Sequence, residues 1–239
     1  MPHTIHNKTS PFFCIVTPVY NPVLESLKLL VSEIRTQTFA DFIHVMISNG
    51  PSEAITPYAH ELNKADRRFI YLELDYENIK TPEEILANLG KRRNHVLKNF
   101  PAQRYLFADA DLKIIRKDYL EKLYRCHVET GKDIILTQVH YIVVSHRKVV
   151  TLPVFPIKKS CIDIANITIS RRIAEKYGYP TNYNPQFDLA NDYRLFITAA
   201  TEENTIIMNF ISAVKNGNSR YKSFMRMTDE NRSRKIVFR

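Results

Sequence analysis

The feature that most constrains the fold is a regular alternation of short apolar runs and amphipathic segments in the first half of the chain. Strand-like runs alternate with helical periodicity four times; the runs cover residues 12–16, 42–47, 69–74 and 105–108. Such alternation predicts an α/β fold with a mostly parallel sheet flanked by helices on both faces.

The second half of the chain has a different pattern. Residues 134–145 and 148–155 are predicted to be extended, with a turn near His146, and helices are expected at residues 170–176 and 189–199. No linker-like stretch separates the halves. A chain of 239 residues therefore suits a single domain.

Several functional classes are excluded or disfavoured by composition. The five glycines form neither a Gly-x-Gly-x-x-Gly loop nor a phosphate-binding P-loop. The three cysteines have no metal-site spacing and are interpreted as structural thiols of a reducing compartment. Because no apolar stretch approaches the length of a membrane span, we expect a soluble, cytoplasmic protein.

Positive charge is concentrated near the C-terminus. The chain has a net charge of +9, and much of the excess lies after residue 213, where only Asp229 and Glu230 oppose the basic residues. A basic tail of this kind can contact anionic lipid, nucleic acid or a phosphorylated ligand. The alternative is a solvated chain end with no partner.

Polar residues follow the predicted strands, where open parallel sheets bind ligands. The sequence YLFADADLKI places Asp109 and Asp111 after the fourth strand. In an extended segment these two side chains share one side, while Ala110 points away. Two carboxylates so placed suit Mn²⁺ or Mg²⁺. The alternative is one helix-capping and one solvated aspartate.

The ordered set of motifs between residues 12 and 199 resembles the family 2 glycosyltransferases of the GT-A fold. The matching segments are IVTPVYNP (15–22), ISNGPSE (47–53), NLGKRRNHVL (88–97), FADADL (107–112), ITISRRIAEKYGYP (167–180) and NDYRLF (191–196). The resemblance implies a Rossmann-like GT-A sheet and metal-dependent transfer of a sugar from a nucleotide-diphosphate sugar to a hydroxyl, with inversion.

The resemblance also implies a division of labour along the chain. Residues 1–112 would bind the nucleotide sugar, residues 113–212 the acceptor, and residues 213–239 would form the basic tail. The expected donor-binding residues are Pro18, Tyr20, Asn21, Asn49, Asp75, Gly90, Lys91, Arg93, Asn94, Asp109 and Ala110. Asn49 replaces the family's usual aspartate, and its amide can both donate and accept hydrogen bonds to a base.

Three consecutive cations, Lys91, Arg92 and Arg93, occupy the position where the family places positive charge near the donor diphosphate. They cannot all face one site on a helix, so we expect Arg93 first and Lys91 second to do so. A solvated basic helix face is the alternative. Asp109 and Asp111 are the implied metal ligands, and Mn²⁺ or Mg²⁺ the implied cofactor.

The acceptor hydroxyl needs a base. The resemblance implies Asp192, with Asp188 four residues earlier as the second candidate, although Asp188 could instead cap a helix. Asn191 replaces the glutamate that usually precedes the base.

The expected partners are a nucleotide-sugar donor, with UDP favoured, and a glycan or lipid-linked acceptor. The tail would give peripheral membrane contact, and no nucleic acid is expected. Two alternatives stay open: an inactive nucleotide- or sugar-binding member of the fold, suggested by Asn49 and Asn191, and a basic nucleic-acid-binding protein.

Overall fold

The computed structural model describes residues 10–19, 24–143, 148–153, 162–181 and 191–217. Within them, nine strands form one sheet, in the order β3-β2-β1-β4-β8-β6-β9-β5, with β7 paired to β6. The strands are β1 (Phe13–Val19), β2 (Phe42–Asn49), β3 (Phe69–Leu74), β4 (Arg104–Phe107), β5 (Lys113–Ile114), β6 (Ile134–Val143), β7 (Lys148–Leu152), β8 (Ile167–Ser170) and β9 (Thr205–Gly217).

The first four strands are parallel, as their alternation with helices predicts. A helix connects each of these strands to the next, so all four run in the same direction and their carboxyl ends lie at one edge of the sheet. The second half is mixed: β8 pairs antiparallel with both β4 and β6, while β9 runs parallel to β6. The predicted α/β fold with flanking helices is confirmed.

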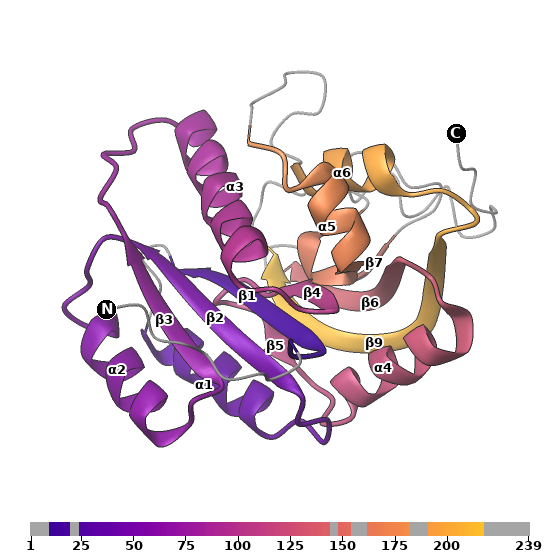
Figure 1. Ribbon diagram of the computed structural model, residues 1–239, viewed down its shortest axis with the longest axis horizontal. Helices are drawn as coiled ribbons and strands as arrows, with labels where there is room; N and C mark the ends of the chain where they lie inside the picture. Colours follow the sequence, from indigo (N-terminus) through magenta and orange to yellow (C-terminus); the bar gives the residue numbers. More distant parts are fainter. Residues whose placement is uncertain (1–9, 20–23, 144–147, 154–161, 182–190, 218–239) are drawn as a thin grey trace.

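Helices cover both faces of the sheet (Figure 1). One face carries α1 (Leu24–Arg35), α2 (Ile55–Ala65) and α4 (Tyr119–Thr130), whose apolar stripes enter one hydrophobic core. The other carries α3 (Pro82–Asn99), α5 (Arg171–Tyr177) and α6 (Asn191–Ala199), which pack into a second core. None of the helices in the described ranges is both long and apolar enough to cross a membrane.

Helix α3 begins where its sequence signals predict. Thr81 is the N-cap: its hydroxyl accepts a hydrogen bond from the Glu84 amide, and the Glu84 carboxylate accepts one from the Thr81 amide. Pro82 follows in the first turn, where its missing N–H costs nothing. This capping box fixes the point at which the chain leaves the loop after β3 and enters the helix.

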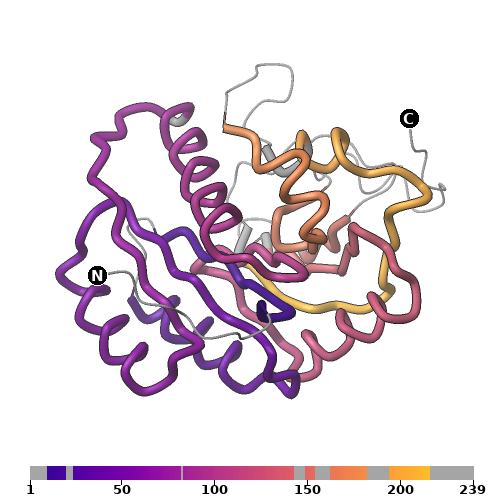
Figure 2. Tube along the Cα trace, viewed as in Figure 1, coloured from indigo at the N-terminus to yellow at the C-terminus, as the bar shows by residue number. Residues whose placement is uncertain are grey.

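Three strands were not predicted from the sequence: β5, β8 and β9. Strand β9 curves along β6 across the sheet (Figures 1 and 2) and reaches Gly217, so it crosses residue 213, the expected start of the basic tail. Residues 213–217 therefore belong to a strand and not to a tail, and residues 218–239 lie outside the described residues. The predicted hairpin is present as β6 and β7, and its turn at residues 144–147 also lies outside them.

Candidate functional site

The two aspartates lie in a tight turn after β4. The Ala108 amide donates to the Val16 carbonyl (3.0 Å), which extends the pairing of β4 with β1 by one residue. The Leu112 amide then donates back to the Asp109 carbonyl (2.9 Å), and the chain continues into β5. Asp109 and Asp111 are thus presented at the carboxyl edge of the parallel strands, as predicted, but they lie in a turn and not in the extended segment that was expected from the sequence.

Two cations hold the Asp109 carboxylate. Arg93 Nη2 lies 3.1 Å from Oδ1, and Lys215 Nζ lies 2.6 Å from Oδ2. Burial alone would raise the pKa of Asp109, but the charges of Lys215 and Arg93 outweigh it and lower the pKa to about 2. Asp109 is therefore ionised at any physiological pH.

Arg93 is itself held in place by aromatic rings. Its guanidinium lies over the ring of Tyr179, 4.5 Å from the centroid, and 5.8 Å from that of Phe107. The side chain is only 5% exposed. A planar cation stacked in this way has little rotational freedom, so its charge is aimed at Asp109.

The neighbouring residues of α3 explain the close approach of the Tyr179 segment. The Asn94 side chain donates to the Tyr179 carbonyl (2.8 Å) and accepts from the Tyr179 amide (2.6 Å). One helical turn earlier, a Cβ on Gly90 would lie 2.5 Å from the carbonyl oxygen of Pro180. These three residues of α3 therefore act together. Gly90 allows the segment of Tyr179 to approach the helix, Asn94 fixes that segment by hydrogen bonds, and Arg93 contacts the Tyr179 ring.

Lys215 lies among three carboxylates. Besides Asp109, its ammonium is 3.6 Å from Asp111 Oδ1 and 3.9 Å from Asp163 Oδ2, and its side chain is 12% exposed. Burial would lower the pKa of this lysine, yet the surrounding aspartates raise it well above the usual value. Burial and the neighbouring carboxylates conversely raise the pKa of Asp111, against the opposing effect of Lys215.

Lys215 and Asp163 are two site residues that the sequence did not reveal. Asp163 caps the short 3₁₀ helix Ile164–Asn166 through a hydrogen bond from the Ala165 amide to its Oδ1 (2.9 Å). Lys215 lies on β9, level with Tyr141 of β6. The available signal was the run of β-branched and aromatic residues after residue 205, which favours a strand rather than a tail.

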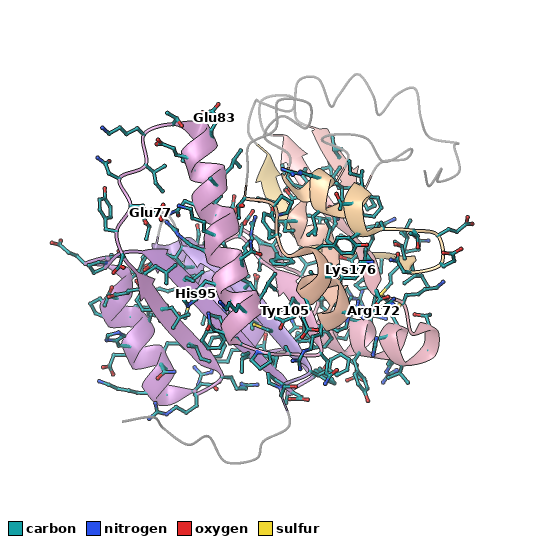
Figure 3. The ribbon with its side chains drawn as sticks, turned by 45° about the horizontal axis from the view of Figure 1, so that its top comes forward. Glu77, Glu83, His95, Tyr105, Arg172 and Lys176 are labelled. Atoms are coloured by element: carbon teal, nitrogen blue, oxygen red, sulfur yellow. The ribbon has the colours of Figure 1, made fainter. Side chains whose placement is uncertain are left out.

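Two other residues that were predicted to bind the sugar-nucleotide donor contact Glu77 instead. The Asn49 side chain makes two hydrogen bonds with the Glu77 backbone: it donates to the Glu77 carbonyl (2.8 Å) and accepts from the Glu77 amide (3.0 Å). The Lys91 ammonium lies 3.1 Å from its carboxylate. Figure 3 shows Glu77 on the loop that precedes α3. The two side chains thereby join the end of β2 and the middle of α3 to this loop, and Lys91 faces a different group from Arg93.

The remaining predicted residues are placed in part. Pro18 is buried within β1, level with Ile47, and Asp75 directly follows β3. Asp192 lies in the first turn of α6, but its side chain is outside the described part of the chain. Tyr20, Asn21 and Asp188 also lie outside the described residues.

The carboxylate oxygens of Asp109 and Asp111 are suitable ligands for a divalent metal ion. Among the described residues, no group of three or more acidic, histidine or cysteine side chains forms a ready-made metal centre. Mg²⁺, however, is commonly bound by one or two carboxylates, with substrate phosphates and water completing its shell. Asp109 and Asp111 fit that requirement, and the Lys215 ammonium lies close to both.

The chain resembles one glycosyltransferase in sequence. It is 32% identical over 120 residues to Glycosyltransferase GlyA of Streptococcus pneumoniae, and the match covers 50% of this chain and 16% of GlyA. No family model matches the chain.

Solved structures share its fold. TarS of S. aureus in complex with UDP has a TM-score of 0.64 at 17% identity, covering 90% of this chain and 62% of that one. The mannosyltransferase PcManGT of Pyrobaculum calidifontis, in complex with GDP-Man and Mn²⁺, has a TM-score of 0.60 at 11% identity, covering 92% and 61%. The chain therefore has a GT-A-like α/β fold and spans less than two thirds of each of these proteins.

Proposed function

We propose that this chain is a family 2 glycosyltransferase that moves a sugar from a nucleoside-diphosphate sugar, with UDP favoured, to an acceptor hydroxyl in glycan synthesis. The observation that carries the proposal is the pair Asp109 and Asp111 at the carboxyl edge of the parallel strands, where the fold binds ligands. The sequence likeness to GlyA, and the UDP and GDP-Man complexes of the two structural neighbours, support the same class.

Asp109 and Asp111 would hold a divalent metal, Mn²⁺ or Mg²⁺, which supplies positive charge to the departing diphosphate. The chain's own part is to keep Asp109 ionised and oriented. Arg93 does so from the buried side, because its guanidinium is stacked on Tyr179 and bonded to Oδ1. Preorganisation of this kind spares the enzyme a rearrangement during reaction.

The nucleoside would lie over the ends of β1 and β2. On this side, polar contacts of Glu77 with Asn49 and Lys91 join the end of β2 and the middle of α3 to the loop after β3. In our proposal Pro18, Tyr20 and Asn21 border the base and ribose, with Asn49, Asp75 and Ala110 beside them.

Asp192, in the first turn of α6, is the proposed base that takes the proton from the acceptor hydroxyl. Attack by that hydroxyl on the anomeric carbon from the face opposite the diphosphate inverts its configuration. Asp188 is the second candidate for this role. The acceptor would be a glycan or a lipid-linked sugar bound by the second half of the chain.

The activity is tested by incubating the protein with UDP- and GDP-sugars, with Mn²⁺ and a panel of glycan and lipid-linked acceptors, and measuring nucleoside diphosphate release and product configuration. Asp192→Asn should lower turnover by about 10²-fold or more while donor binding is retained, because removal of a general base affects the chemical step. Glu61→Gln, the same carboxylate-to-amide change at an exposed residue of α2, is the control.

Two results would count against this account. A product with retained configuration would contradict the inverting mechanism. Tight donor binding without turnover, for every donor and acceptor tried, would favour the alternative of a sugar-nucleotide-binding protein without catalysis.

A further inference from the structure

We propose that Lys215 is a tethered cation that competes with a divalent metal for Asp109 and Asp111. The proposal rests on the metal position put forward above and deepens it, because it states what regulates entry of the metal. In the metal-free protein, the lysine ammonium offsets part of the negative charge of the carboxylates; when a metal arrives, the ammonium gives up its place.

The geometry shows why the Lys215 ammonium and a metal ion would compete for the Asp109 carboxylate. One carboxylate oxygen, Oδ1, is bonded to Arg93, and the other, Oδ2, is 2.6 Å from Lys215 Nζ. A Mg²⁺ ion needs an oxygen at about 2.0–2.1 Å and near-octahedral ligand positions. The ammonium also lies 3.6 Å from Asp111 Oδ1, and is thus close to both proposed ligands.

Charge favours the same conclusion. Three aspartates and two cations, Arg93 and Lys215, give this cluster a net charge of 2 − 3 = −1. Without the lysine charge it would be −2, and its attraction for a divalent cation correspondingly stronger. Lys215 therefore weakens metal binding to the donor-free protein, and the phosphates of an arriving donor help to restore it.

The lysine has a route by which to move. The β9 backbone on either side of it is fixed by pairing with β6 and, at Ala213 and Val214, with β5. Its four-carbon side chain can still turn, and Asp163 Oδ2 lies only 3.9 Å from the ammonium. Exchanging Asp109 for Asp163 needs a side-chain rotation and no movement of the sheet.

The test is Mn²⁺ binding to the nucleotide-free full chain, measured by electron paramagnetic resonance of the free ion. Lys215→Met should bind Mn²⁺ at least tenfold more tightly than the wild type. Lys113→Met makes the same change at an exposed lysine of the neighbouring strand β5 and should match the wild type. Equal or weaker binding by Lys215→Met would overturn the proposal.

A second measurement needs no substitution and covers the case in which Lys215→Met fails to fold. In the ¹⁵N-lysine-labelled wild type, saturating Mg²⁺ should shift the side-chain Nζ resonance of Lys215 and leave that of Lys113 unchanged. An unmoved Lys215 resonance while Mg²⁺ is bound would show that the metal and the ammonium do not compete.

These measurements are made without nucleotide and so separate the two proposals. If Lys215→Met gains metal affinity but no sugar nucleotide is turned over, the competition stands and the transferase activity fails. If sugar transfer is observed while Lys215→Met binds metal no more tightly, the proposed function stands and the role of Lys215 fails.

Discussion

The guanidinium of Arg93 is stacked on the ring of Tyr179, 4.5 Å from its centroid, while one of its nitrogens lies 3.1 Å from Asp109. These three residues come from α3, the segment after α5 and the turn after β4. The carboxylate at the strand end is therefore positioned by a contact between two distant parts of the chain, and changes to that contact should be felt at Asp109.

Asn94→Ala should loosen the contact. The substitution removes both side-chain hydrogen bonds to the Tyr179 backbone and leaves a partly buried amide and carbonyl without those partners. We expect a loss of about 1–3 kcal/mol in the free energy of unfolding, measured by urea denaturation. Asn99→Ala, which removes an exposed bond to the His95 carbonyl at the end of the same helix, should cost much less. Equal losses would contradict this role for Asn94.

For Gly90→Ala, helix propensity and packing predict changes of opposite sign in the free energy of unfolding. In a helix interior the change alone should stabilise the protein by about 1 kcal/mol. Here the new Cβ would lie 2.5 Å from the Pro180 carbonyl oxygen and 3.1 Å from Thr181 Cα. We expect a net destabilisation of about 1–3 kcal/mol, since backbone must move. A rise in the thermal midpoint would show that residues 179–181 can retreat without cost.

His44 should make stability depend on pH. Burial lowers its pKa to about 3, and its Nε2 is 2.7 Å from the Thr17 hydroxyl. Because the histidine of the unfolded chain has a pKa of about 6.5, it binds a proton at pH values below 6.5, whereas His44 of the native protein stays neutral until the pH approaches 3. The stability due to neutral His44 is complete above pH 6.5 and falls by about 1.4 kcal/mol per unit as the pH drops toward 3.

Urea denaturation between pH 4 and 8 measures this dependence. His44→Gln keeps a hydrogen-bonding side chain but cannot titrate, so its stability should fall less steeply below pH 6.5 than that of the wild type. If both proteins show the same slope, another group is responsible.

To test membrane contact by the basic C-terminal residues, the chain should be truncated after Gly217. A cut after residue 213 would remove the end of β9 together with Lys215, and would confuse a folding defect with a loss of binding. Removing residues 218–239 should weaken sedimentation with anionic vesicles, because each basic residue near a charged bilayer contributes about 1 kcal/mol. Unchanged vesicle binding would sink the proposed membrane contact.

Much of the parallel half of the fold could be predicted because its signals are local. Apolar runs, helical periodicity and the Thr81–Glu84 cap each lie within a few residues, and the predicted strand ends bring Asp109 and Asp111 to the edge of the sheet. Lys215 could not be predicted in the same way. Its contact with Asp109 joins residues 106 positions apart, and it depends on how β9 pairs with β6.

Local patterns also concealed what individual side chains do. Lys91 and Arg93 are two residues apart on one basic helix, yet the first pairs with Glu77 and the second with Asp109. Their sequence neighbourhood is nearly the same, and only the three-dimensional packing of Tyr179 and of the loop after β3 distinguishes them. The order of cations along α3 was visible in the sequence, whereas their partners were not.

The most direct test of the central claim is calorimetric titration of UDP and GDP into the wild type and into Asp111→Ala, with and without Mn²⁺. We expect a nucleoside diphosphate to bind the wild type much more tightly when Mn²⁺ is present, and this metal-dependent gain to disappear in Asp111→Ala. Failure of every nucleoside diphosphate to bind the folded wild type, with or without Mn²⁺, would contradict the account.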